Sequence, residues 1–73
     1  GKLRYVVRNG NSYGDVKPRF TVILYDENAV QSGIAKIFWL FDSVGPGKSR
    51  EEEERFESGP SNKPPRYFRV EFK

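Results

Sequence analysis

The segment 45–49, GPGKS, contains the residue types that a phosphate-binding loop uses. Such a loop follows a buried strand, opens a helix and wraps a phosphate with backbone N–H groups, and it needs eight residues that begin with glycine. Asp42 occupies the first of those eight positions here, so a negative charge would lie where the phosphates belong. The segment is therefore interpreted as a Gly/Pro turn that ends a strand.

The four consecutive carboxylates of Glu51–Glu54 raise the question of a hard cation such as Ca²⁺. Calcium loops bring carboxylates together from spaced positions around a tight glycine turn, whereas four consecutive glutamates do not converge in any regular element. We interpret them as a solvated charge run. An alternative is that the run lies across a basic face of the domain and imitates a polyanion.

Catalysis has few residues to use, because the chain has no His and no Cys. It therefore has neither a disulfide nor a thiolate or imidazole metal ligand. Ser, Lys and Tyr are present, but no spacing pairs a nucleophile with a base. The carboxylates left for a paired-carboxylate mechanism are Asp15, Asp26 and Asp42. We expect no enzyme, no catalytic residue, no metal site, no cofactor and no small-molecule substrate.

The arginines and tyrosines on the polar faces of the expected strands are the residues that indicate most about function. On a sheet surface, cations meet phosphates, while tyrosine rings and guanidinium planes stack on the bases of single strands. The alternative is an ordinary solvated sheet face, where Arg, Tyr and Thr are common. The predicted nucleic-acid-binding residues are Arg4, Arg8, Arg19, Tyr25, Tyr67, Arg69 and Lys73.

These residues belong to a chain of 73 residues, which makes one small domain. A domain of this size buries only about 60% of the surface of its unfolded chain, so six Phe, four Tyr and one Trp must supply much of the core. No segment approaches the about 20 apolar residues that span a bilayer, and residues 1–10 have no signal-peptide pattern. With no Cys, these features favour an intracellular protein without a membrane partner.

The net charge of +3 is unevenly distributed along the chain. The segment 50–57 has a net charge of −3, and the other residues have a net charge of +6. The body of the domain is therefore more basic than the whole chain, which favours polyanionic partners.

Three segments, 2–8, 19–26 and 66–73, alternate apolar and polar residues with the period of two that predicts half-buried strands. Asn9-Gly10 follows the first of them and is a strong turn signal. The residues expected to face the core are Leu3, Tyr5 and Val7, then Phe20, Val22 and Leu24, and finally Phe68, Val70 and Phe72.

The segment 34–41, IAKIFWLF, is the densest apolar run, with seven apolar residues of eight. A central strand covered on both faces is apolar in this way, so we expect a strand at 34–42 with Trp39 at the centre of the core. The alternative is a helix over 28–44 with Asn28 as its cap. Gly33 would cost that helix about 1 kcal/mol.

The segment 45–65 contains four of the five prolines and three glycines, and Phe56 is its only large apolar residue. It cannot bury enough apolar surface to offset the entropy lost on ordering. We therefore expect a long, flexible, charged loop within the single domain 1–73.

These observations predict a mostly β fold, a small antiparallel sheet or barrel of about four strands with a long charged loop. The alternative is an α+β fold of order ββαβ, in which 28–44 is helical. The predicted function is non-enzymatic binding of nucleic acid, single strands preferred, through the basic and aromatic sheet face. The alternative is a protein–protein interaction module in which the edge strand 66–73 pairs with a partner strand.

Overall fold

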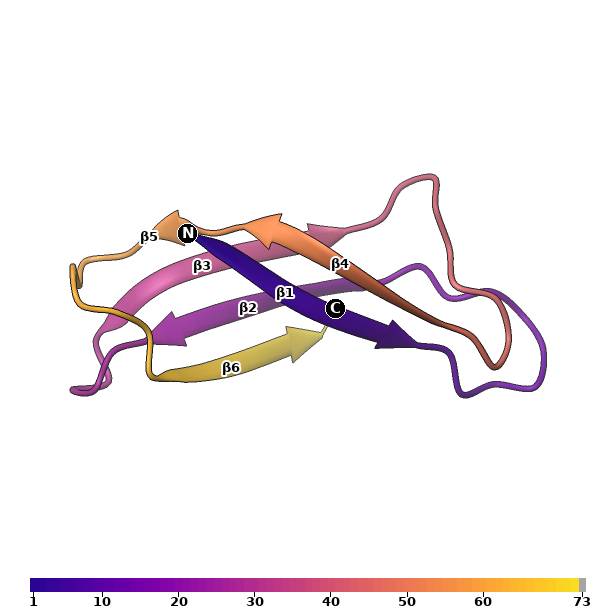
Figure 1. The fold of residues 1–73 in the computed structure, drawn as a ribbon, viewed down its shortest axis with the longest axis horizontal. Coiled ribbons are helices and arrows are strands. Elements are labelled where there is room, and N and C mark those ends of the chain that lie inside the picture. The colour runs from indigo at the N-terminus through magenta and orange to yellow at the C-terminus, as the bar shows by residue number, and fades with distance from the viewer. Residues whose placement is uncertain (73) are drawn as a thin grey trace.

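The computed structural model describes residues 1–72, which form six β-strands and no helix. Two antiparallel sheets result, one of order β1–β4 and one of order β5–β3–β2–β6 (Figure 1). The mostly β prediction is confirmed, and the helical alternative for 28–44 is wrong because β3 lies within that segment and no helix forms there. The strands are β1 (Lys2–Arg8), β2 (Arg19–Tyr25), β3 (Gln31–Phe38), β4 (Ser49–Arg55), β5 (Glu57–Ser58) and β6 (Tyr67–Phe72).

The two sheets pack face to face, with β1 and β4 lying obliquely across the four-stranded sheet in Figure 1. Successive side chains of a strand point to opposite faces, and in β1 the half-buried set is the predicted one. Leu3 and Tyr5 pack against the core, while Arg4 and Arg8 are exposed. The Tyr5 ring meets the Phe20 ring edge-on at 5.6 Å, so the layers are joined by apolar contact.

The buried core consists of Val22 and Leu24 of β2 with Ala35 and Ile37 of β3. β2 is the central strand because it pairs with β3 on one side and with β6 on the other. Burying these apolar side chains is the main source of stability in a domain of this size. Ile37 is among the largest fully buried side chains, and it marks the centre of the core.

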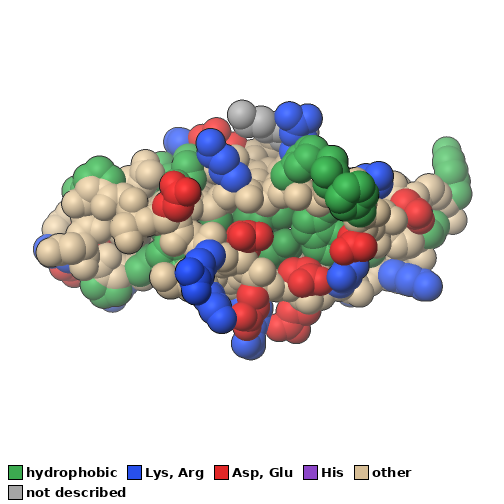
Figure 2. All heavy atoms as spheres, turned by 90° about the horizontal axis from the view of Figure 1, so that it is seen from above, with side chains coloured by type: hydrophobic (Ala, Val, Ile, Leu, Met, Phe, Trp, Pro, Cys, Tyr) green, Lys and Arg blue, Asp and Glu red, His purple; other side chains and the backbone are tan. Residues whose placement is uncertain are grey.

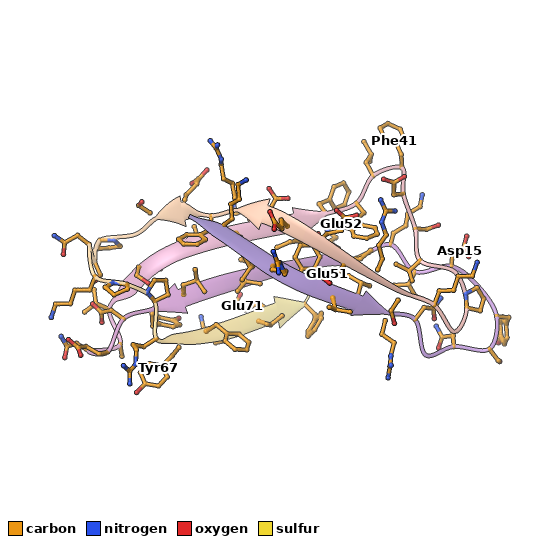
Figure 3. The ribbon with its side chains drawn as sticks, in the orientation of Figure 1. Asp15, Phe41, Glu51, Glu52, Tyr67 and Glu71 are labelled. Carbon is orange, nitrogen blue, oxygen red and sulfur yellow. The ribbon has the colours of Figure 1, made fainter. Side chains whose placement is uncertain are left out.

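β3 begins and ends earlier than the predicted strand 34–42, at Gln31–Phe38. Its last paired residue is Phe38, and the next N–H, that of Trp39, donates to the Pro18 carbonyl at 3.1 Å. Proline has no N–H with which to return the bond, so the ladder ends there. Phe41 lies in the loop that follows, is 88% exposed and points away from the body (Figure 3).

Trp39 is therefore not the centre of the core, and that prediction is wrong. Its half-buried ring packs at the edge of the core, where the indole N–H donates to the Tyr5 hydroxyl at 2.8 Å. Burial raises the pKa of Tyr5 above its ordinary value. The guanidinium of Arg50 covers the Trp39 ring at 5.0 Å, which is cation–π distance.

The segment 45–65 is not the continuous loop that was predicted, because β4 and β5 lie within it. The sequence of β4 has no alternation of apolar and polar residues, so its strand conformation is specified by its pairing with β1. β4 pairs with β1 over the whole length of both strands, and it thereby satisfies backbone groups of β1 that would otherwise be unpaired. Phe56, between β4 and β5, packs against the core. It lies so close to Gly33 that a Cβ there would fall 2.6 Å from its ring.

The loops at the other end of the molecule are joined by Asn9, which is 1% exposed. Its side-chain amide donates to the carbonyls of Gly14 and Val44, at 2.8 and 2.9 Å. Its own N–H donates to the Lys48 carbonyl at 2.9 Å. The predicted Gly/Pro segment 45–49 forms a turn, in which the Lys48 N–H donates to the Gly45 carbonyl at 3.1 Å. The turn leads into β4, however, and does not end the preceding strand, since β3 stops at Phe38.

We expect Ile37→Ala to lower the free energy of unfolding by about 2–5 kcal/mol, because it leaves a cavity at the centre of the core. Phe41→Ala removes a larger side chain from an exposed loop and should change stability by no more than about 0.5 kcal/mol. Urea unfolding monitored by Trp39 fluorescence measures both. Equal losses in the two variants would contradict the position assigned to the core.

Candidate functional site

The predicted nucleic-acid-binding residues lie on two opposite surfaces of the molecule. Arg4 and Arg8 are on the outer face of β1, because Leu3 and Tyr5 of that strand face the core. The others lie on the outer face of the four-stranded sheet, on the far side of the core, at Arg19, Tyr25, Tyr67 and Arg69. Lys73 is outside the described residues. The structure therefore does not bring the predicted set together.

The outer face of the β1–β4 sheet is not a basic surface, because β4 supplies acids beside the bases of β1. Arg4 forms ion pairs with Glu51 at 3.4 Å and Glu53 at 3.0 Å. The hydrogen bond to Glu53 is the main reason that the pKa of Arg4 lies above its ordinary value. On the side of the molecule seen in Figure 2, acidic and basic side chains are intermixed. Arg4 is thus already neutralised within the chain.

The outer face of the four-stranded sheet keeps more of its positive charge. Lys36 of β3 lies on it opposite Thr21, and the guanidinium of Arg19 lies 5.3 Å from the centre of the Phe38 ring. Arg69 pairs with Glu71 at 2.7 Å. The sequence prediction missed Lys36 and Phe38, although Lys36 is the one polar residue in the run 34–41. Lys36 interrupts the apolar run because its side chain points to the outer face of β3, a central strand.

An open apolar groove of about 710 Å³ lies between the two layers, along β1, β2 and β6. Its floor includes Phe20 and Val70, and its wall on the β6 side includes Phe68 and Phe72. The groove exists because β1 and β4 cover the inner face of the four-stranded sheet only in part. Phe68 and Phe72 face the core side, as predicted, yet they are 71% and 81% exposed.

β6 forms the edge of the four-stranded sheet, and within residues 1–72 only β2 pairs with it. An edge strand presents unpaired N–H and C=O groups along its free side. Tyr67 begins the strand and extends to the outside of the molecule (Figure 3). A free strand edge and a row of exposed apolar side chains therefore lie next to each other.

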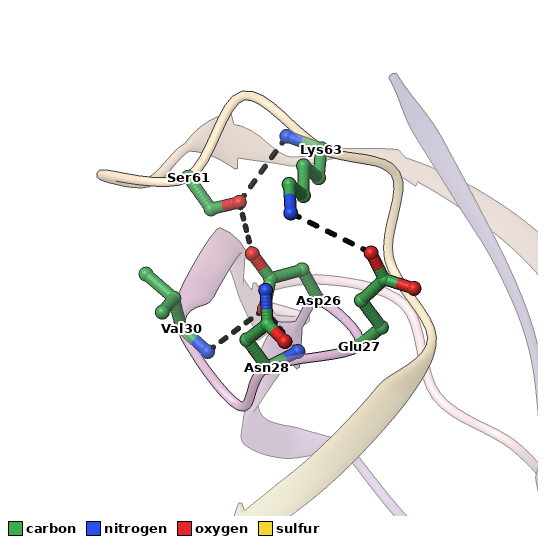
Figure 4. Close-up of polar contacts among 6 residues, drawn as sticks. All are labelled: Asp26, Glu27, Asn28, Val30, Ser61 and Lys63. Carbon is green, nitrogen blue, oxygen red and sulfur yellow. Dashed lines mark hydrogen bonds and ion pairs between the residues drawn. The ribbon is translucent and has the colours of Figure 1, made fainter.

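Asp26 holds the chain that leads into β6 against the β2–β3 hairpin (Figure 4). One carboxylate oxygen accepts the N–H groups of Asn28 at 2.8 Å and Val30 at 3.0 Å, and the other accepts the Ser61 hydroxyl. Asp26 is 2% exposed. The Ser61 hydrogen bond, followed by that of Val30, lowers the pKa of Asp26 below its ordinary value.

Among residues 1–72, no three His, Cys, Asp or Glu side chains lie close enough together to hold a metal ion. The same residues include no helix long and apolar enough to cross a membrane. No family model, curated protein or solved structure matches the chain.

Because the pKa of Asp26 is lower in the folded state, its carboxylate stabilises the fold at pH values above the ordinary aspartate pKa of about 4. That stabilisation should be lost as the pH falls through the lower, folded-state pKa. We expect Asp26→Asn to reduce stability at neutral pH and to weaken the acid dependence of the urea midpoint. Glu27→Gln is the control, because Glu27 is an exposed carboxylate of the same hairpin, paired with Lys63 at 3.5 Å. An unchanged pH profile in Asp26→Asn would contradict this assignment.

Proposed function

We propose that this domain is a protein-interaction module that binds an extended segment by pairing it with the free edge of β6. The observation that carries the proposal is the adjacency of that edge to the apolar groove. Strand addition takes its affinity from main-chain hydrogen bonds and its specificity from pockets for alternate side chains. The edge supplies the hydrogen bonds, and the groove is open to every second side chain of an added strand.

The sequence of β6 supports this use because it lacks the features that keep edge strands from pairing. Proteins protect an edge with proline, with a bulge or with a charged side chain that points inward. From Tyr67 to Phe72 there is no proline, and the register with β2 is continuous. The charged residues Arg69 and Glu71 belong to the outer face, and the inward positions are Phe, Val and Phe.

The outer face of the four-stranded sheet supports nucleic-acid binding as a second candidate. Arg19, Lys36 and Arg69 share this face with Tyr25 and Tyr67, which is the combination used to hold single strands by phosphate contacts and stacking. Arg4 and Arg8 do not belong to this candidate, because they lie on the opposite layer. The face is also partly neutralised, since Glu71 pairs with Arg69.

Strand addition is tested with a displayed library of random eight-residue peptides selected against the immobilised protein. We expect the enriched peptides to alternate apolar and polar residues and to slow amide hydrogen exchange in β6. Phe68→Lys places a charge on the groove side of the edge and should abolish binding. Phe41→Lys, the same substitution at an exposed phenylalanine that does not line the groove, is the matched control. Selected peptides that bind Phe68→Lys as well as the wild type would contradict the proposal.

Nucleic-acid binding is tested by fluorescence anisotropy with labelled single-stranded DNA and RNA at two salt concentrations. Lys36→Ala and Arg19→Ala should each reduce the slope of log affinity against log salt by about one unit. Tyr67→Ala should cost about 1–3 kcal/mol of affinity with little change in the slope. Arg55→Ala, in the other sheet, is the control. Absence of salt-dependent binding at low ionic strength would rule this candidate out.

A further inference from the structure

The exposed edge strands of this chain differ in whether their charges can pair with those of an identical strand. In a pair related by a two-fold axis, the same strand supplies both partners, so each charge must meet its opposite on a copy of itself. All the charged residues of β1 are basic, and β4 contains four consecutive glutamates. β5 has only two residues. β6 alone among these edges carries one base and one acid, Arg69 and Glu71.

The spacing of those two charges selects one register. When β6 pairs antiparallel with β6 of a second copy and Val70 lies opposite Val70, Arg69 of each copy lies opposite Glu71 of the other. Moving the centre to Arg69 or to Glu71 places like charges opposite each other, which is unfavourable. An odd register would place apolar residues opposite charged ones, because it joins the inner face of one sheet to the outer face of the next. The centre at Val70 avoids these conflicts, and it pairs Phe68 to Phe72 of each copy, whereas a centre at Phe68 or Phe72 would leave at least half of β6 unpaired.

The same register also complements the inward face of β6. Phe68 of each copy lies opposite Phe72 of the other, on both sides of the central valine pair. Directly opposed aromatic residues on one face of an antiparallel pair attract each other. These two phenylalanines are the exposed members of the inward set, at 71% and 81%, and Val70 between them is half-buried. The pairing therefore covers the apolar side chains that β1 and β4 leave open.

In the single chain, Arg69 and Glu71 already lie on the face where the proposed pairing needs them. Arg69 and Glu71 are two residues apart on the outer face and form an ion pair at 2.7 Å. Both side chains are accessible for exchange with a second copy, since they are 60% and 47% exposed. In the dimer, each can pair across the strands without leaving its own face.

We propose that the strand captured by β6 is β6 of a second copy, so that two chains form a symmetric dimer with one continuous eight-stranded antiparallel sheet. This inference rests on the proposed function of the β6 edge and names its partner. The contact is isologous and closes at two chains, because each chain uses its one β6 edge.

The test measures the dissociation constant of the dimer by analytical ultracentrifugation from micromolar to millimolar protein. Arg69→Glu and Glu71→Arg each place two pairs of like charges across the contact, and each should weaken the dimer at least about tenfold. The double variant R69E/E71R restores opposite charges and should dimerise as the wild type does. An equimolar mixture of the two single variants should form a heterodimer, because one carries only acids and the other only bases at these positions.

Lys36→Glu is the matched control, because it reverses one exposed charge on the same sheet face, two strands away from the edge. It should change the dissociation constant less than about threefold. Far-ultraviolet circular dichroism confirms that each variant keeps its fold. The mixing experiment remains informative if one single variant is less stable, since only complementary charges produce the heterodimer.

Three outcomes would overturn the inference, and they separate it from the proposed function. A wild type that stays monomeric while selected peptides still protect β6 rules out the second copy and leaves strand addition standing. A wild-type dimer that is not rescued in R69E/E71R contradicts the register. Growth beyond the dimer indicates a head-to-tail contact between β6 and another edge. If neither peptides nor a second copy protects β6, the proposed function fails as well.

Discussion

A layer of two strands cannot cover a sheet of four, and this mismatch in width determines most of what the molecule exposes. β1 and β4 cover the inner face of β2 and β3, where Ala35 and Ile37 are each only 2% exposed. They leave the inner face of β6 to solvent. Exposed apolar patches on a soluble domain commonly mark interaction sites. The same geometry that completes the core on one side therefore creates the groove on the other.

The position of β6 depends on a polar contact at the end of the β2–β3 hairpin. The chain between β5 and β6 has few apolar residues, so Ser61 and Asp26 hold it in place instead. The Arg66 N–H then donates to the Tyr25 carbonyl at 2.7 Å and starts the pairing of β6 with β2. A buried carboxylate is costly unless its oxygens are hydrogen-bonded, and here both are. The β6 edge is thus held in place by a buried acid at the end of the hairpin.

Alternation of apolar and polar residues was sufficient to predict β1, β2 and β6, because the side chains of each strand alternate between the inner and the outer face of its sheet. In β6 only Val70 of the inner set packs against the core. Alternation failed for β4, whose sequence contains no apolar residue and whose pairing is specified by β1. The continuous apolar run 34–41 placed the end of β3 too late, because the ladder ends at Pro18, a residue distant in sequence from Trp39. Interactions between distant segments are invisible to a periodicity that is read along one strand.

The candidate site shows the same limit more sharply. Sequence reasoning correctly placed arginine and tyrosine on outward faces, and it named strand 66–73 as a possible pairing edge. The sequence alone could not show that Arg4 and Arg69 lie on opposite layers, because that depends on which strands share a sheet. The exposure of Phe68 and Phe72 was equally hidden, since their spacing is that of core residues.

Asn9 gives the loop end of the molecule a chemical weakness that stability measurements on fresh protein would not reveal. Asparagine is a thermolabile residue, and its conversion to aspartate replaces an amide nitrogen with a carboxylate oxygen of nearly the same shape. At this position the nitrogen donates to two carbonyl oxygens, those of Gly14 and Val44. The carboxylate would turn two attractive contacts into repulsive ones inside a buried site. Hydrolysis of this one amide would therefore weaken the connection between the loops that Asn9 joins.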